Sequence, residues 1–493
     1  MKGKWLFVLA FAGLGVACSF GVSGAGNRPG AGECVTVNGD RPRVVVMTDG
    51  EVDDRCSMVH FLLSTNDLDV QAIIQSNSCF QRHGWSSIHW LEKQIDDYEK
   101  AYPNLAVHDA AYPTPDYLRS VCFVGDEDES HIPERYSGAM TRPGEEPRID
   151  PSLWPDTPGS ERILELLLDS DPRTLYLCAW GGSNTAARAF WKLREDYPDR
   201  YQQALSKVVM YNIWYQDGAG SYIERNFPMV TMLLSYNFSG TWDYDSQRYM
   251  DAFVRENLRG KFGDLSTNYV QDVCSEGDSP SFFYLLGNGL RSYENPAFGG
   301  WGGQFHPVEG MPNVYVDNDK GSYFRWTEYV NRDFEARLRW CTAEKYEDAN
   351  HRPRITLESE RYMTVHSGDT VKLAARVEDH DGVDAEAIWR SNIGMAMREN
   401  RGIRSLEELK DKLDGELKDM VRFSSGVRAF WWQYPEAGTY KGFLDLPPMG
   451  PETRFVAPEV SSPETIHLIL EATDRDTPPM SAFERVVVTV LPR

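Results

Sequence analysis

Three carboxylates stand close together near the start of the chain. Asp49, Asp53 and Asp54 directly follow the apolar run 44–46 and precede an amphipathic stretch that ends near Leu62. Such a run is typical of a buried parallel strand, and open α/β sheets bind ligands beyond the carboxyl ends of their strands. Because crowded carboxylates repel one another, a hard divalent cation such as Ca²⁺ would compensate them. The alternative is an acidic surface turn that caps the following helix.

Three later segments carry polar side chains where further strands are expected to end. They are residues 75–78, 180–185 and 276–280. The second is a tight turn whose backbone carbonyls are suited to a cation. Because the carboxyl ends of parallel strands share one edge of a sheet, these segments are expected near the aspartates.

Residues 41–348 are predicted to form one α/β domain. Strand-like segments at 43–48, 70–75, 174–179 and 207–211 alternate with helix-like segments at 53–64, 88–98, 160–169 and 185–193. Repeated β-α-β units predict a doubly wound, mainly parallel sheet. Long polar insertions at 125–158 and 287–310 are expected to be lids or binding loops. In the second, Trp301 among glycines is either a sugar-stacking platform or a core residue in a glycine-rich turn.

Residues 353–493 have a different pattern, typical of an immunoglobulin-like β-sandwich. Short strands are expected at 354–359, 370–377, 438–443, 465–472 and 485–491, and a helical insert at 406–420. Five aspartates in its turns fit either a second calcium site or solvated turns; they are Asp379, Asp381, Asp384, Asp474 and Asp476.

The N-terminus predicts export. Lys2 and Lys4 precede an apolar stretch that suits a signal peptide over residues 1–17. Residues 14–18 are similar to a bacterial lipobox, which predicts lipidation at Cys18, a flexible tether over 18–40 and an outer-membrane lipoprotein in the periplasm or at the cell surface. Cleavage after Ala25 without lipidation is the alternative. On this interpretation the chain meets the membrane only through its lipid.

Composition narrows the range of partners. A formal net charge of −23 repels phosphate backbones, which argues against nucleic acid and favours neutral or cationic small molecules or uncharged polysaccharide. The cysteines are dispersed and form no C-x-x-C pair, so their pairing stays open. A P-loop, an H-E-x-x-H zinc motif and a complete G-x-S-x-G elbow do not occur in the sequence.

Taken together, these motifs resemble the inosine/uridine-preferring nucleoside hydrolase superfamily. Asp49, Asp53 and Asp54 match the last three aspartates of its D-x-D-P-G-x-D-D motif, Ser183-Asn184 is similar to its Thr-Asn turn, and Asp278 to its final Asp-Pro turn. The chain is more similar to a bacterial cellulose-binding protein family with a nucleoside hydrolase-like N-terminal domain and an immunoglobulin-like C-terminal domain. That likeness rests on residues 180–182, 227–228, 300–303, 432–440 and 467–470.

The resemblance implies roles for individual residues. Ca²⁺ would be held by Asp49, Asp54, Asp278 and the main-chain carbonyl of Ser183, and Asp49 would also take a proton from the attacking water. Asp53 would hydrogen-bond a ribose hydroxyl. The further candidates for substrate contact are Asn77, Asn184, Glu224, Asn226 and Trp301.

Departures from the pattern leave two functions open. Met47 replaces the first aspartate of the motif, Gly50-Glu51 replaces Pro-Gly, and Gly277 stands where many nucleoside hydrolases have a His that protonates the leaving base. The first hypothesis is a calcium-dependent hydrolase of an N-riboside or related small glycoside. The alternative is a carbohydrate-binding surface protein that grips cellulose-like polysaccharide through exposed tryptophans, including Trp431 and Trp432. A third hypothesis is that the sandwich has a purely structural role.

Overall fold

The computed structural model describes residues 41–133, 138–241, 253, 258–269, 276–381, 427–447 and 449–493. The predicted signal peptide 1–17, lipidation at Cys18, tether 18–40 and helical insert 406–420 lie outside these residues. Within them, no helix combines the length and the apolar character needed to cross a bilayer.

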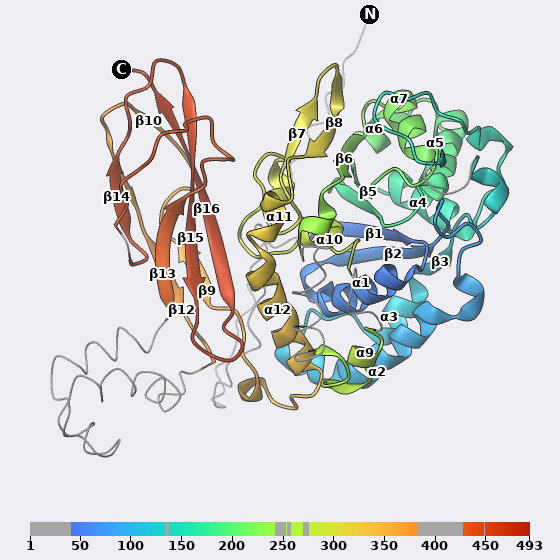
Figure 1. Cartoon of the computed structure of the whole chain (residues 1–493), viewed down its shortest axis with the longest axis horizontal. Helices are drawn as coiled ribbons and strands as arrows, with labels where there is room; N and C mark the ends of the chain where they lie inside the picture. The colour runs from blue at the N-terminus through green and yellow to red at the C-terminus, as the bar shows by residue number, and fades with distance from the viewer. Residues whose placement is uncertain are drawn as a thin grey trace, which may run out of the picture.

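A large, mainly parallel sheet forms the centre of the N-terminal part (Figure 1). In the described residues its order is β3-β2-β1-β4-β5-β6-β8-β7, and only the β7–β8 hairpin is antiparallel. The strands are β1 Arg43–Thr48, β2 Asp69–Gln75, β3 Cys122–Val124, β4 Leu175–Ala179, β5 Val208–Ile213, β6 Thr231–Ser235, β7 Phe305–Val308 and β8 Met311–Asp317. Chain order reverses between β1 and β4, and in open α/β sheets ligands bind at the carboxyl edge beside such a reversal.

Helices cover both faces of this sheet. Val44 and Val46 of β1 pack with α1 and α2, whereas Val45 and Met47 pack with α4 and α5. The helices are α1 Val52–Leu63, α2 Trp90–His108, α3 Pro115–Ser120, α4 Pro158–Leu168, α5 Asn184–Asp196, α6 Tyr201–Leu205, α7 Ala219–Asn226, α9 Gly263–Thr267, α10 Pro280–Phe283, α11 Gly321–Phe324 and α12 Thr327–Trp340. Burial on both faces explains the continuous apolar run of β1 and confirms the predicted α/β class.

The C-terminal part is all-β in the described residues, as predicted. Its sheets are β10-β16-β15-β13, β11-β14 and β12-β9, packed around one apolar core. The strands are β9 Arg354–Leu357, β10 Tyr362–His366, β11 Thr370–Leu373, β12 Ala375–Glu378, β13 Arg428–Gln433, β14 Thr453–Val456, β15 Glu464–Thr473 and β16 Ser481–Leu491.

Two of the predicted sandwich strands are wrong in detail. Residues 438–443 form no strand, because Gly438 lies flush against the carbonyl of Thr465 and the backbone passes the end of β15 without pairing along it. The predicted strand 370–377 is two strands, since β11 pairs with β14 and β12 with β9.

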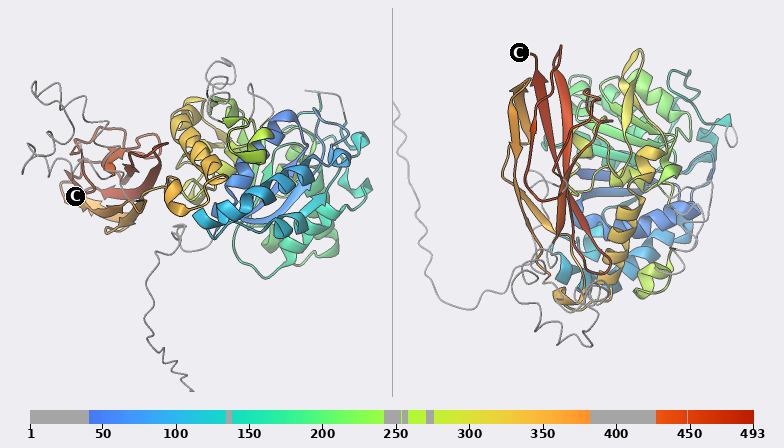
Figure 2. Two further views of the ribbon diagram at one scale, coloured as in Figure 1. Left: turned by 90° about the horizontal axis from the view of Figure 1, so that it is seen from below. Right: turned by 60° about the vertical axis from the view of Figure 1, so that its left-hand side comes forward.

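The C-terminal sheets lie beside the α/β part (Figure 2), and buried side chains join the two. Buried Arg485 of β16 donates to the carbonyls of Leu290 at 2.7 Å and Gly299 at 2.9 Å, both in the insertion 287–310. Trp326, just before α12, packs edge-on against Phe483 with ring centroids 5.6 Å apart. The insertion therefore holds the sandwich in place and is not the open binding loop expected from the sequence.

The prediction that tryptophans form exposed platforms for sugar stacking is also wrong, because these side chains pack inside the protein. Trp301 is 1% exposed and belongs to the core, with the guanidinium of Arg352 lying 5.4 Å from its ring. Trp431 is buried in the sandwich core, and Trp432 packs 6.1 Å from Trp326 at the interface. A polysaccharide chain cannot stack on the buried rings of Trp301 and Trp431, and partly buried Trp432 already packs against Trp326.

Helix α12 is fixed to the sheet by a buried ion-pair cluster. The Arg337 guanidinium donates to Asp333 at 2.8 Å, to Asp67 at 2.6 Å and to the carbonyl of Leu63 at 2.8 Å. All three charged side chains are nearly inaccessible, and Arg352 adds a second guanidinium, 2.6 Å from Asp333 and 3.8 Å from Asp67.

We predict that Arg337→Met destabilises the protein by about 3 to 5 kcal/mol, because it leaves two buried carboxylates, Asp67 and Asp333, to share the single guanidinium of Arg352. Denaturant unfolding followed by circular dichroism measures this change. Arg339→Met on the same helix is the matched control; its partner Glu335 is at the surface side of α12, and the expected loss is below about 1 kcal/mol. Equal losses for both variants would contradict the assignment.

Candidate active site

The first wall of the site is the turn from β1 into α1. Gly50 adopts a φ of +75°, and an added Cβ there would lie 2.8 Å from the indole nitrogen of Trp90. This turn brings Asp49 and Asp54 together, because the Thr48 hydroxyl donates to Asp54 and the Glu51 amide donates to Asp49 at 3.2 Å. Both aspartates are buried.

A carboxylate from far along the chain completes the cluster. Asp278 is 2% exposed and lies just before α10. Carboxylate oxygens of Asp53, Asp54 and Asp278 all lie within 4.8 Å of one another. The structure thus brings together the acidic motifs that the sequence places at two strand ends. It differs from the predicted ligand set in one respect, because Asp53 and not Asp49 belongs to this closest group.

The turn after β4 forms the second wall. An added Cβ at Gly181 would lie 2.8 Å from the Cβ of Asp49, so only glycine allows this approach. The Ser183 carbonyl accepts the first hydrogen bond of α5, from the Ala187 amide at 2.9 Å. Asn184 is buried, and neither its amide nitrogen nor its oxygen has a hydrogen-bond partner.

Burial and mutual repulsion disfavour the ionised state of the carboxyl groups in this cluster. Burial, followed by repulsion from the neighbouring carboxylates, raises the pKa of Asp54 and of Asp278 well above the ordinary value. Burial also raises the pKa of Asp49. Half-buried Glu51 feels the same burial and repulsion, which raise its pKa to about 8. Among the described residues, Asp49, Asp54 and Asp278 have no ion-pair partner.

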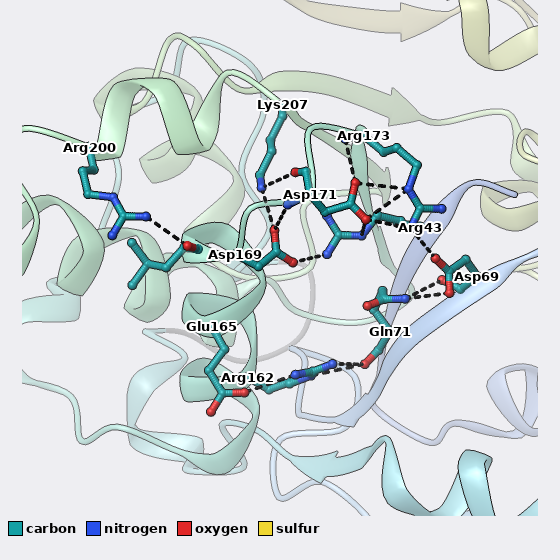
Figure 3. A network of polar contacts seen from close by, with 11 residues as sticks. Arg43, Asp69, Gln71, Arg162, Glu165, Asp169, Asp171, Arg173, Arg200 and Lys207 are labelled. Atoms are coloured by element: carbon teal, nitrogen blue, oxygen red, sulfur yellow. Dashed lines mark hydrogen bonds and ion pairs between the residues drawn. The ribbon is translucent and has the colours of Figure 1, made fainter. Parts of the chain in front are cut away.

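At the opposite edge of the sheet, carboxylates are paired with basic side chains (Figure 3). At the amino ends of the strands, Asp171 pairs with Arg173 at 2.7 Å and with Arg43 at 3.4 Å. Hydrogen bonds from Arg173 lower the pKa of Asp171 to about 2. Lys207 pairs with Asp169 at 3.1 Å in the same network. In the part of the chain that the structure describes, the buried aspartates at the carboxyl edge have no such pairing, so that edge carries an excess of negative charge.

The donor set fits a hard cation such as Ca²⁺. Oδ2 of Asp49, Oδ2 of Asp278 and Oδ1 of Asn77 are buried oxygens without a hydrogen-bond partner. Ca²⁺ takes carboxylate, amide and main-chain carbonyl oxygens and compensates several negative charges at once. Buried polar atoms are ordinarily satisfied, so unpartnered oxygens in one acidic cluster indicate room for a ligand.

Two predicted substrate contacts have other partners. Glu224 is buried and accepts from the Gly144 amide at 2.7 Å and the Tyr215 hydroxyl at 3.0 Å. Asn226 donates to the Tyr222 carbonyl of its own helix at 2.8 Å. Both side chains stabilise α7 and its neighbouring loop, so nothing in their bonding points to substrate.

Two supporting carboxylates were not assigned these roles from the sequence. Asp217 accepts from the amides of Ser183 at 2.6 Å and Asn184 at 3.1 Å, and so fixes the turn after β4. Glu276 accepts from His60 Nδ1 at 2.9 Å and from the Ser279 hydroxyl at 2.6 Å, and so fixes the turn that carries Asp278. Glu276 lies in the polar segment 276–280 that the sequence marks, whereas Asp217 lies in none of the marked segments, and their partners Ser183 and His60 are distant in the sequence.

Two family models match the chain. The family model described as cellulose-binding Sde182, nucleoside hydrolase-like domain, matches residues 43–305, and that of the cellulose-binding protein Sde0182 C-terminal domain matches residues 425–490. The chain belongs to this family. Both parts of the fold, and the acidic motifs within the first, fall inside the matched ranges.

A solved structure shows the same fold. A nucleoside hydrolase-related protein from Saccharophagus degradans, described as associated with carbohydrate metabolism, is 24% identical with a TM-score of 0.71, over 92% of this chain and 100% of that one. A plant nucleoside hydrolase and an inosine-guanosine nucleoside hydrolase match 61% of this chain and 99% and 98% of their own. Their identities are 13% and 14% and their TM-scores 0.33 and 0.31, too low to carry an argument. The comparison with curated proteins gave no match.

We predict that Ca²⁺ raises the thermal stability of the protein and that Asp278→Asn abolishes this response. Ligand at one hundred times its Kd stabilises by about 2.7 kcal/mol. In EDTA the same variant should be more stable than the wild type, because it removes one of several repelling charges. Differential scanning calorimetry with and without calcium measures both effects.

The control is Asp169→Asn at the opposite edge of the sheet. It removes a paired carboxylate, so it should destabilise the protein and leave the calcium response intact. An undiminished calcium response in Asp278→Asn would contradict the assignment of the cluster.

Proposed function

We propose that the chain is an exported, calcium-dependent hydrolase of N-ribosyl or related small glycosidic bonds. The observation that carries this proposal is the acidic cluster at the carboxyl edge of the sheet, in which buried Asp49 and Asp278 each have a carboxylate oxygen without a hydrogen-bond partner. Asp49, Asp54, Asp278 and the Ser183 carbonyl are the proposed ligands, with Asp53 close enough to share in the site. Bound Ca²⁺ supplies charge compensation and an ordered, more acidic water.

Asp49 is suited to act as the general base. Its Oδ2 has no hydrogen-bond partner, and burial raises its pKa above the ordinary value of a carboxyl group, which makes it a stronger base. The amide of Glu51 and the close backbone of Gly181 hold the carboxylate in one orientation. A fixed base with a free oxygen can take the proton of a water as it attacks the anomeric carbon.

The remaining acidic side chains favour the transition state of glycoside cleavage. Asp53 is half-buried, so it lies on the accessible side of the cluster and can hydrogen-bond a sugar hydroxyl. The nearby carboxylates stabilise positive charge that develops on the sugar ring, as in an oxocarbenium-like transition state. Asn77 and Asn184, which both have buried unpartnered side-chain atoms, are the proposed neutral contacts to the sugar.

The glycine at position 277 limits which leaving groups the proposed hydrolase can release. Gly277 has no side chain to protonate a departing base. The site therefore favours substrates whose aglycone leaves readily as an anion or is protonated by solvent. This expectation distinguishes the chain from hydrolases that carry a histidine there.

We expect Asp49→Asn to lower the release of reducing sugar from an activated riboside by at least ~10²-fold, because the general base is lost. A reducing-sugar assay with p-nitrophenyl riboside and calcium measures it. Asp116→Asn, an exposed residue of α3, is the control and should retain full turnover. Turnover by Asp49→Asn equal to that of the control would rule out this role.

A second candidate function is polysaccharide binding by the C-terminal part, supported by the family to which the chain belongs. Of the tryptophans proposed for it, Trp301 and Trp431 are buried and Trp432 is partly buried, but Phe443 is 88% exposed in the loop between β13 and β14. That loop is fixed, since Gln433 donates to the Gly442 carbonyl at 2.9 Å and accepts from the Leu444 amide at 3.0 Å. A rigidly held, exposed ring is suited to stack on a sugar face.

For this function, Phe443→Ala should reduce retention of the full chain on insoluble cellulose by roughly fivefold, the effect of losing an aromatic contact of about 1 kcal/mol. Met449→Ala, another exposed apolar residue in the same region, is the control. Sedimentation with cellulose measures the bound fraction. Equal retention of wild type and Phe443→Ala would exclude Phe443 as the contact.

A further inference from the structure

A cavity of about 170 Å³ lies where the α/β part, the sandwich and the segment that joins them meet. It is on the side of residues 66–67, which lead into the amino end of β2, and so at the opposite edge from the acidic cluster. Its wall includes Asn66, Asp67, Trp340, His351, Phe483 and Glu484.

The size of this cavity distinguishes it from a packing defect. Voids larger than one water are few in protein interiors. At ~30 Å³ per water, this space corresponds to about five or six waters. It can hold one small ring with its substituents but not an oligosaccharide.

The polar part of the wall is held in place before any ligand arrives. Asn66 donates to Asp109 at 2.8 Å and accepts from Arg337 at 2.5 Å, and Arg337 donates to Asp67 at 2.6 Å. Carboxylate oxygens in such networks keep further lone pairs, so they can accept from hydroxyl groups. A fixed set of acceptors lowers the ordering cost of binding.

The apolar part of the wall is aromatic. Trp340, Tyr346 and Phe483 line the cavity, and the His351 ring stacks on Tyr346 at 3.8 Å. Aromatic faces next to planar carboxylate and amide groups match a sugar ring, which offers C–H faces and a rim of hydroxyls.

Charge in the wall points to a neutral ligand. Three carboxylates and three guanidiniums line the cavity; they are Asp67, Asp109, Glu484, Arg337, Arg352 and Arg354. The closest of these already pair, as Arg337 does with Asp67. An ionic ligand would break such pairs, whereas a neutral polyol adds hydrogen bonds to them.

We propose that this cavity binds one neutral sugar ring, an aldopentose or aldohexose, between the two parts of the chain. The site is separate from the acidic cluster and does not depend on the hydrolase proposal. Because the ligand touches both parts, it stabilises their junction when bound.

Isothermal titration of the full chain with D-ribose and D-glucose tests this proposal, and cellobiose probes the size limit. We expect saturable one-site binding of at least one monosaccharide below ~10 mM and at least tenfold weaker binding of cellobiose. His380→Trp places a large side chain at an exposed position of the cavity wall and should weaken binding at least tenfold.

Two controls separate the alternatives. His366→Trp makes the same change at an exposed position of β10 away from the cavity and should bind like the wild type. Asp49→Asn alters the acidic cluster and should also retain binding. Absence of saturable binding to the wild type would overturn the proposal, as would binding lost in Asp49→Asn and kept in His380→Trp.

Discussion

Carboxylates that share a poorly solvated cavity repel one another, and this repulsion governs the organisation of the N-terminal domain. Asp54 and Asp278 are buried with raised pKa values, on turns that depend on Thr48 and Glu276 for their geometry. A fold keeps such an arrangement only if something compensates the charge when the protein works. At the other edge of the same sheet, arginines and Lys207 provide that compensation within the chain.

The position of the cluster follows from the sheet topology. The reversal of strand order between β1 and β4 separates the loops that follow them, and Asp49 and Ser183 lie in those loops. Gly181 lets the second loop approach the first. Asp278 enters from a third segment, ahead of α10. The site is therefore a product of tertiary structure, with each wall anchored by a buried carboxylate such as Asp217 or Glu276.

The sandwich is joined closely to this framework. Its β16 donates Arg485 to the insertion 287–310, whose Gly302 lies against α10, directly after Asp278. The same insertion was predicted to be an open loop, because its glycines and polar residues suggest exposure. A local pattern could not show that Trp301 packs in the core beside Arg352, or that Trp432 of the sandwich packs against Trp326 of the α/β part.

Much of the site could be predicted from the sequence, because it follows strands with clear apolar runs. The strand 43–48, the helix after it and the turn 180–185 are local signals, and the structure confirms them. The prediction of a strand at 438–443 is wrong, because alternating side-chain types do not show whether a segment pairs with a neighbouring strand. Partners separated by hundreds of residues, such as Glu276 and His60, leave no trace in a local pattern.

The most direct test of the central claim is diffraction from crystals grown with calcium, using its anomalous signal. The account predicts a single strong peak within about 2.3 to 2.6 Å of oxygens from the first aspartate loop and from Asp278. A map with only water among these carboxylates, or with Asp278 turned away from Asp54, would contradict it.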